Sequence, residues 1–177
     1  MAENENIQTS GSSEQQQAPE QQQETPVFQM QRCYLKDASL EMPHAPEILM
    51  QPQQEAPQVD IQFEVSQRAI QPELIDVTVR GTVTVKAGEK AIILVECKQS
   101  GIFAVRGIPA EPLQHVTNVL CPSIVYPYLR ANIADLMTRA NVPPVHLPEV
   151  NFEILYQQRL AQAQAEAHQQ TAANQQN

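Results

Sequence analysis

The chain has 177 residues, a formal net charge of −9 and 42% hydrophobic residues. This length allows one domain with its own core, and the acidic balance argues against a nucleic-acid partner, because phosphates bind to cationic surfaces. We find no secretory signal pattern and no apolar run near the roughly 18 residues that cross a bilayer, so we expect no membrane insertion. The three cysteines lack CxxC spacing, which is typical of reduced thiols and favours a cytoplasmic location.

The ends of the chain differ in composition from its middle. Residues 1–26 contain seven Gln and five Glu but no Lys or Arg. Such a segment buries too little apolar area to offset the entropy lost on folding. Residues 157–177 are rich in Gln and Ala, which indicates a fraying helix followed by a tail. We therefore expect a disordered N-terminal arm at 1–26, a folded domain at 27–163 and a disordered tail at 164–177.

The first predicted element is a strand at 28–41, FQMQRCYLKDASLE. Asp37 and Glu41 give one of its faces an acidic character that indicates a docking surface. At roughly 13 Å apart on an extended strand, the two carboxylates are too distant for paired acid/base chemistry. On the residues alone, a solvated face that discourages edge aggregation is the favoured alternative. The expected faces are Leu35, Asp37, Ser39 and Glu41 on one side and Lys36, Ala38, Leu40 and Met42 on the other.

Three more strands are predicted from alternating apolar residues, at 59–65, 75–85 and 91–99. The sequence AGEK at 87–90 is typical of a hairpin turn between the last two of these strands. The connections are too short for helical crossovers, so the sheet should be antiparallel. In the fourth strand we assign Ala91, Ile93, Val95, Cys97 and Gln99 to the face that helices cover and Ile92, Leu94, Glu96 and Lys98 to the outside.

The connection between the first two strands, 43–57, is too long for a hairpin loop. It is rich in Pro and Gln and contains the apolar residues Ile48, Leu49 and Met50. Long loops with exposed apolar residues in compact domains often bind partners, so we expect a functional role for this loop.

After residue 109 the apolar spacing changes to three and four residues, which predicts helices. Pro127 should lie near the start of the first helix, where its missing N–H does no harm. Asn151 should cap the second helix, with Glu153 in its first turn. The predicted fold is α+β, a four-stranded antiparallel sheet with two C-terminal helices packed on one face. The apolar stripes are Tyr126, Leu129, Ile133, Leu136 and Met137 in the first helix and Phe152, Leu155, Tyr156, Leu160 and Ala163 in the second.

The first of these helices carries more apolar surface than one sheet needs. Its apolar arc is widened by Ile124, Val125, Tyr128 and Ala131. We therefore expect an oligomer, with Val95, Cys97 and Gln99 contributing to the interface between subunits.

The sequence lacks the patterns of a catalytic or cofactor site. It contains no phosphate-binding loop, and its four histidines are far apart. Cys97, His115 and Cys121 are the side chains that a zinc or thiol site would use, but no close Cys pair supports such a site. We predict no catalytic, cofactor-binding or metal-binding residues. A small-molecule or metal-binding domain that uses these three side chains stays an alternative of a different class.

Four segments carry a family resemblance: FQMQRCYLKDASLEMPHAP at 28–46, GIFAVRGI at 101–108, LCPSIVYPYLR at 120–130 and LPEVNFEIL at 147–155. In this order they resemble the SecB family of protein-export chaperones. The resemblance implies a cytosolic, ATP-independent chaperone, not an enzyme, that holds precursor proteins unfolded and passes them to the SecA motor. It also implies a homotetramer, a dimer of dimers with helices packed between two eight-stranded sheets.

The resemblance further implies roles for individual residues. The SecA-docking positions of the family fall on Asp37, Glu41, Leu94 and Glu96. Its client groove lies beside the crossover loop and the second helix, where Ile48, Leu49, Phe152 and Tyr156 are the candidates. The loop here contains no Trp, unlike that of better-known relatives. A SecB-like chaperone of a toxin–antitoxin system is the alternative within the same class.

Overall fold

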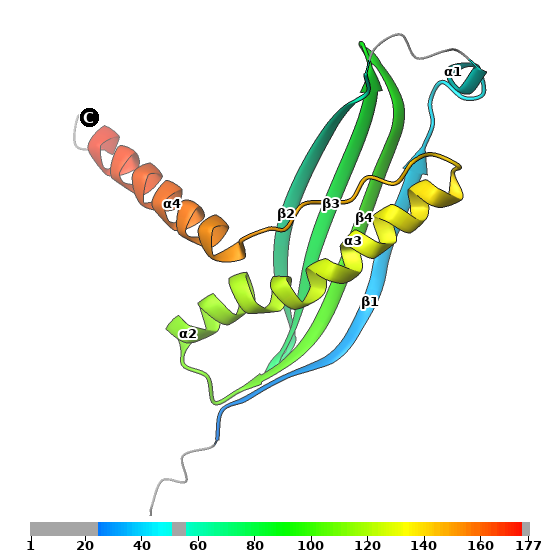
Figure 1. Ribbon diagram of the computed structural model, residues 1–177. Helices are drawn as coiled ribbons and strands as arrows, with labels where there is room; N and C mark the ends of the chain where they lie inside the picture. The colour runs from blue at the N-terminus through cyan, green and yellow to red at the C-terminus, as the bar shows by residue number, and fades with distance from the viewer. Residues whose placement is uncertain (1–24, 51–55, 175–177) are drawn as a thin grey trace, which may run out of the picture.

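The computed structural model describes residues 25–50 and 56–174, and Figure 1 shows one sheet with a helical layer across one of its faces. Nearly all of the predicted arm at 1–26, and the loop residues 51–55, lie outside the described residues. The strands are β1 Val27–Glu41, β2 Gln58–Gln71, β3 Leu74–Ala87 and β4 Lys90–Arg106, and the helices are α1 Glu47–Met50, α2 Ala110–His115, the π-helical turn η1 Val116–Leu120, α3 Cys121–Arg139 and α4 Phe152–Asn174.

The four strands form one antiparallel sheet in the order β1-β4-β3-β2, which confirms the prediction. Ala87 pairs with Lys90 across the β3–β4 turn, where Gly88 has φ 56°, a left-handed conformation that glycine adopts without a steric cost. β4 is longer than predicted and continues through Ser100 and Gly101. Both residues pair with β1 and β3, so the sheet overrides their low strand propensity.

A β-bulge in β1 corrects the predicted faces of two residues. The register shifts between Leu35, which pairs with Gln99, and Asp37, which pairs with Lys98, so Lys36 is the extra residue. Leu35 therefore lies with Gln99 on the inner face, which α3 covers, and Lys36 lies with Asp37 on the opposite, outer face. The prediction that Leu35 and Asp37 share a face is wrong, because simple alternation does not register an inserted residue. After the bulge the predicted alternation is confirmed.

The bulge brings Lys36 into a buried polar cluster on the outer face. Lys36 Nζ donates to Asp76 Oδ2 at 2.9 Å and to Thr78 Oγ1 at 3.2 Å, and Tyr34 Oη donates to Asp76 Oδ1 at 3.1 Å. Asp76 is only 2% exposed, so these donors satisfy a carboxylate that would otherwise be costly to bury. The contacts tie β1 to β3 over the intervening strand β4.

The helical segment that follows the sheet begins with α2 at Ala110, directly after residue 109, where the sequence predicts helical spacing. In η1 the Cys121 N–H donates to the Val116 carbonyl, and this wider turn precedes Pro122, whose ring would clash with a carbonyl in a regular α-helix. Pro127 lies inside α3, so the prediction that it lies near the helix start is wrong. Pro127 and Ser123, four residues earlier, are both exposed, so water can solvate the carbonyl that lacks a donor.

Helix α3 packs against β3 and β4 at two glycines. A Cβ at Gly81 would lie 3.0 Å from Ile133 Cδ1 and 3.1 Å from Leu129 Cδ2, and one at Gly101 would lie 2.9 Å from Val125 Cγ2. The absence of side chains at these positions lets the helix approach the sheet closely. The buried stripe of α3 comprises Val125, Tyr126, Leu129, Ile133 and Met137.

Helix α4 is attached to the domain through its first turn. The Ile154 N–H donates to Asn151 Oδ1 at 3.1 Å, which confirms the predicted N-cap, and Glu153 lies in the first turn. Phe152 is buried against the end of the helical layer. The N-terminal end of α4 is therefore fixed by a cap, by an apolar anchor and by a hydrogen bond between Glu153 and His115 of α2.

Beyond that turn, α4 extends away from the sheet (Figure 1), and its apolar residues Leu155 and Leu160 are exposed. The helix continues to Asn174, through much of the segment predicted to be a tail. The α+β prediction is confirmed, with α3 as the helix that covers the sheet. No helix in the described part of the chain is both long and apolar enough to cross a bilayer.

Gly101→Ala should destabilise the fold by about 1–3 kcal/mol, because overpacking a filled site forces neighbours to shift. The added Cβ would lie 2.6 Å from Phe103 Cε2 as well as 2.9 Å from Val125 Cγ2. Gly81→Ala should have a smaller effect, since its contacts are the ends of flexible side chains. Urea unfolding at a fixed protein concentration measures both changes, and an unaltered stability of Gly101→Ala would contradict the packing described.

Candidate functional site

The first candidate surface, the outer-face patch, consists of Asp37, Glu41, Leu94 and Glu96. Asp37 pairs with Lys98 and Glu41 pairs with Leu94 across the β1–β4 ladder. Glu96 lies between these two β4 residues at a spacing of two, so all the side chains project from the outer face. The structure thus brings together the four residues that the family resemblance implies for docking.

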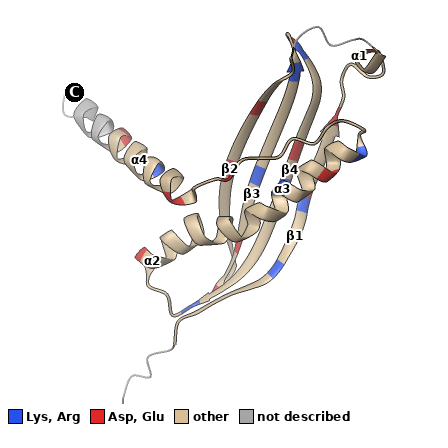
Figure 2. Cartoon of the chain, in the orientation of Figure 1, with Lys and Arg blue, Asp and Glu red and all other residues tan. Residues whose placement is uncertain are grey.

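Ion pairs cross the outer-face patch and continue over the sheet. Lys98 Nζ lies 3.0 Å from Asp37 Oδ2 and 3.3 Å from Glu96 Oε1. Glu96 also contacts Arg80 on β3, and Arg80 lies 3.4 Å from Glu64 on β2. This chain of contacts links all four strands, and Figure 2 shows basic and acidic segments interspersed over the sheet.

The ion pairs stabilise the charged forms of the side chains in and beside the outer-face patch. The hydrogen bond from Arg80 lowers the pKa of the Glu96 carboxyl, with a smaller contribution from Lys98. Hydrogen bonds to Asp37 and then to Glu96 raise the pKa of Lys98. Both groups therefore stay charged at neutral pH. Glu41 has no ion-pair partner among the residues that the structure describes.

The second candidate surface, the loop pocket, is an apolar cavity of about 490 Å³ beside α1. Ile48 is buried there, whereas Leu49 is 54% exposed. Most of the lining is aliphatic or proline, which suits an apolar segment of a bound chain. The lining residues are Ile48, Leu49, Pro57, Val59, Val85, Ile92, Ile93, Met137, Asn141, Val142, Pro143, Pro144 and Val145.

The third candidate surface, the aromatic cluster, lies where α4 begins. The Phe152 ring is edge-on to Tyr126 with centroids 5.6 Å apart, and Tyr126 is edge-on to Phe63 at 5.5 Å. Tyr156 is edge-on to His115 at 6.2 Å. A shallow pocket of about 400 Å³ opens beside Phe152. The Phe152 and Tyr126 rings are themselves buried, so the cluster supports the wall of an open depression instead of exposing its rings.

The four residues predicted for client binding divide between these two places. Ile48 and Leu49 line the loop pocket, Phe152 lines the depression at the aromatic cluster, and the two cavities share no lining residue. The prediction did not include Phe63 or Tyr126, which complete the aromatic cluster. In the sequence the only signal for these two residues is that Phe63 lies on the apolar side of its strand and Tyr126 lies on the apolar stripe of its helix.

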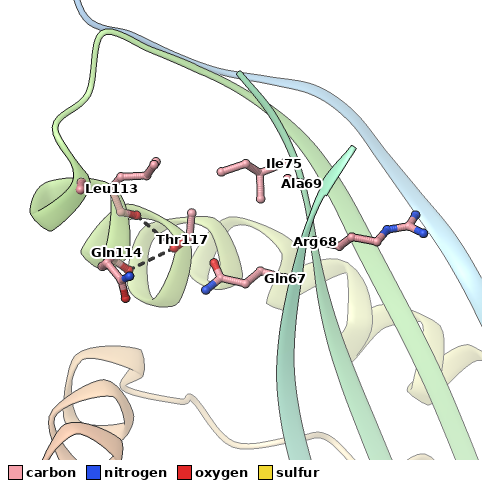
Figure 3. A pocket seen from close by; sticks show the side chains of 8 residues that line it. Gln67, Arg68, Ala69, Ile75, Leu113, Gln114 and Thr117 are labelled. Atoms are coloured by element: carbon pink, nitrogen blue, oxygen red, sulfur yellow. Dashed lines mark hydrogen bonds between the residues drawn. The ribbon is translucent and has the colours of Figure 1, made fainter. Parts of the chain in front are cut away.

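A further hollow of about 260 Å³ lies between β2 and α2 (Figure 3). Ile75 and Leu113 supply apolar surface, and the amides of Gln67 and Gln114 lie at its rim, whereas Arg68 points away from it. β2 is an edge strand of the described sheet, so an extended peptide at this hollow would also meet free backbone groups.

The three residues predicted for a subunit interface lie inside one subunit. Val95 and Cys97 have no exposed surface, and Gln99 is 3% exposed. Gln99 Oε1 accepts a hydrogen bond from Asn132 Nδ2 at 2.7 Å, and its Nε2 lies 3.2 Å from Cys33 Sγ. One chain therefore already covers all three side chains.

The residues of the alternative metal or thiol site have different environments. Cys97 and Cys121 are buried, whereas His115 is exposed and its Nε2 lies 2.6 Å from Glu153 Oε2. Burial raises the pKa of the Cys97 thiol to about 11 and that of Cys121 to about 12, so both thiols stay protonated and weakly reactive. Within residues 25–50 and 56–174, no three potential metal ligands lie together.

Comparisons with known proteins identify relatives over most of the chain. A family model described as preprotein translocase subunit SecB matches residues 21–163. Protein-export protein SecB of Methylibium petroleiphilum is 49% identical over 154 residues, which cover 87% of this chain and 91% of the relative. The SecB proteins of Ralstonia nicotianae and Burkholderia mallei are 49% and 47% identical, and the matches cover 88% and 84% of this chain and 88% and 92% of theirs.

One solved structure is similar at lower identity. It is a SecB-like chaperone of Mycobacterium tuberculosis in complex with a ChAD peptide from an antitoxin, with a TM-score of 0.57 and 18% sequence identity. The match covers 70% of this chain and 90% of that one. At this identity the similarity shows the fold alone.

The raised thiol pKa values predict that Cys97 and Cys121 resist a thiol reagent at about pH 8 in the folded protein and react when denaturant exposes them. A Cys33→Ser variant isolates these two thiols, because Cys33 is the partly exposed one. Mass spectrometry after timed labelling measures the outcome. Rapid labelling of either residue in the folded variant would contradict burial as the cause and support the thiol-site alternative.

Proposed function

The chain belongs to the SecB family of protein-export chaperones, and from this premise we propose that it holds precursor proteins unfolded in the cytosol and delivers them to the SecA motor. The observation that carries the delivery step is the outer-face patch, where three carboxylates and Leu94 share one exposed surface. The proposed role requires neither catalysis nor a nucleotide, since holding and delivery are binding events. The antitoxin peptide is a partner of the mycobacterial protein, and 18% identity does not extend it to this chain.

The outer-face patch suits a cationic partner with an apolar contact. Asp37, Glu41 and Glu96 provide negative charge, and Leu94 provides a half-buried apolar side chain beside them. Complementary charge speeds the encounter of two proteins and aligns them. SecA would therefore dock on the sheet face opposite α3, away from the cavities proposed for clients.

We place client contacts at the loop pocket, the aromatic cluster and the free edge of β2. A chaperone that accepts many unfolded sequences cannot depend on one pattern of side chains, so apolar surface and backbone hydrogen bonding are the suitable means of recognition. Ile48, Leu49, Phe152 and Tyr156 are the proposed contact residues. Ile48 and Phe152 are buried and shape these surfaces, whereas Leu49 is accessible to a bound chain.

We propose that the chain assembles as a homotetramer, a dimer of dimers. The exposed side of the helical layer carries Leu120 and Tyr128, which are 41% and 47% exposed and could pack against another subunit. Val95, Cys97 and Gln99 would then act by supporting α3 from within the subunit. Light scattering should give the mass of a tetramer for the unmodified chain and a smaller assembly for Tyr128→Asp, because an unpaired charge is costly to bury. A monomeric unmodified chain would rule the proposal out.

Replacing Leu49 and Tyr156 by Ser should weaken binding of an unfolded precursor by roughly fivefold to tenfold, because apolar contact area is lost. Fluorescence titration with a labelled precursor measures the change. Leu160→Ser is the matched control, since Leu160 is an exposed apolar residue outside the candidate cavities. If all these variants bind as tightly as the unmodified chain, including one with Ile48→Ser and Phe152→Ser added, the clients bind elsewhere.

The triple charge reversal Asp37→Lys, Glu41→Lys and Glu96→Lys should lower the affinity for SecA by roughly tenfold or more while leaving assembly and client holding intact. Asp37 and Glu41 are exposed charges that contribute little to folding, whereas Glu96 is 23% exposed and bonded to Arg80, so unchanged light scattering and urea unfolding are needed to confine the loss to docking. Titration calorimetry with purified SecA measures it. A control with Glu89, Glu111 and Glu149 each changed to Lys makes the same change in net charge away from the patch. Equal affinities of the two triple variants would move the docking site elsewhere.

A further inference from the structure

Lys98 is a cation placed inside a surface proposed to bind cations. Its Nζ lies 3.0 Å from Asp37 Oδ2 on β1 and 3.3 Å from Glu96 Oε1 on its own strand. It therefore contacts two of the three carboxylates of the outer-face patch at once. A basic group of a docking partner would have to share these oxygens with Lys98 or displace it.

The other charged groups around Lys98 define what a partner encounters. Arg80 on β3 contacts Glu96 and Glu64, so it is held between two carboxylates, and its Nε is buried. Lys98 also contacts two carboxylates and is slightly less exposed than Arg80, 35% against 42%, but its single ammonium ends a flexible four-carbon side chain, whereas Arg80 carries a planar guanidinium with a buried Nε. Lys98 is thus the cation that can move aside with the least rearrangement.

The three carboxylates of the outer-face patch are not equally available to a partner, because two of them are already paired with cations of this chain. Asp37 and Glu96 are bonded to cations of this chain, whereas Glu41 has no ion-pair partner within the described residues. A partner would first meet the charge of Glu41 and then exchange with Lys98 for the remaining two carboxylates. Such an exchange replaces one exposed ion pair by another, so the net gain in affinity is small for each contact.

We propose that Lys98 is a specificity-determining residue of the docking surface, an internal competitor that occupies Asp37 and Glu96 until a cationic segment of SecA replaces it. This inference rests on the proposed function of the outer-face patch. The competition would keep docking weak and reversible and would disfavour partners that carry only scattered positive charge. A partner must offer enough cations, together with a contact for Leu94, to outweigh the internal ion pairs.

The test is titration calorimetry of Lys98→Gln with purified SecA at two salt concentrations. Removing the competitor should tighten binding roughly two- to fivefold at low salt, the range that one exposed ion pair supplies, and the gain should shrink at high salt. Lys90→Gln is the matched control, since it removes the same charge from the same strand at an exposed residue. That variant should bind SecA within twofold of the unmodified chain.

A second variant pair separates competition from a change in net charge or folding. In a background with Asp37→Asn and Glu96→Gln, Lys98→Gln should no longer tighten binding, because its two partners have lost their charge. A gain that persists unchanged in this background would overturn the inference. So would an affinity of Lys98→Gln equal to that of Lys90→Gln, or a weaker affinity, which would make Lys98 a direct contact of SecA.

The outcomes also distinguish this inference from the proposed function. If the triple charge reversal abolishes docking but Lys98→Gln has no effect, the patch is the docking site and the competition is absent. If the triple charge reversal binds SecA normally, or the unmodified chain does not bind it, the proposed docking fails and the role of Lys98 fails with it.

Discussion

The close approach of α3 to the sheet is the constraint on which the rest of the structure depends. Gly81 and Gly101 omit the side chains that would hold Leu129 and Val125 away from β3 and β4. At this separation the helix buries the inner face of the central strands and gathers nearly the whole apolar core on one side of the sheet. The side chains of the outer face are therefore largely not needed for core packing, apart from the buried cluster around Asp76.

This division lets a single strand serve two purposes. Side chains of β4 alternate, so Cys97 belongs to the core while its neighbours Glu96 and Lys98 belong to the exposed face. Acids alone on adjacent strands would repel one another, and the interleaved cations relieve that repulsion. The ion pairs thus hold the charged side chains of this surface in a fixed arrangement. Substitutions among them can change binding with little effect on the core, because exposed ion pairs contribute little to stability.

The candidate client surfaces lie at the margins of the helical layer instead of beneath it. The loop pocket adjoins α1, the aromatic cluster adjoins the first turn of α4, and the hollow of Figure 3 adjoins α2. An unfolded chain is long enough to reach several such places, and linked weak contacts raise the overall affinity without a demanding fit at any one of them. Helix α4 is attached only near its N-terminal end, by its cap, by Phe152 and by contacts of Glu153 and Tyr156 with His115, and its following turns are exposed.

The sequence by itself determined the strands, the antiparallel hairpin, the two faces of β4 from Ile93 to Gln99 and the Asn151 cap, because these depend on periods of two or 3.6 residues and on local hydrogen bonds. The predicted faces of Ala91 and Ile92 are wrong, because a register shift at Ile92 pairs Ala91 with the exposed Lys86, while Ile92 packs against the core. The alternation also placed Asp37, Glu41, Leu94 and Glu96 on outward faces, and the family resemblance made them candidates for docking. Only the tertiary structure decided that Lys36 is bulged, that Pro127 lies inside a helix, and that Ile48 and Phe152 belong to separate cavities. The ion-pair partners of Asp37 and Glu96 also could not be predicted from the sequence. A local period carries no information about which strand lies alongside, where neighbouring layers end, or which charges meet across them, and these long-range contacts fix the site.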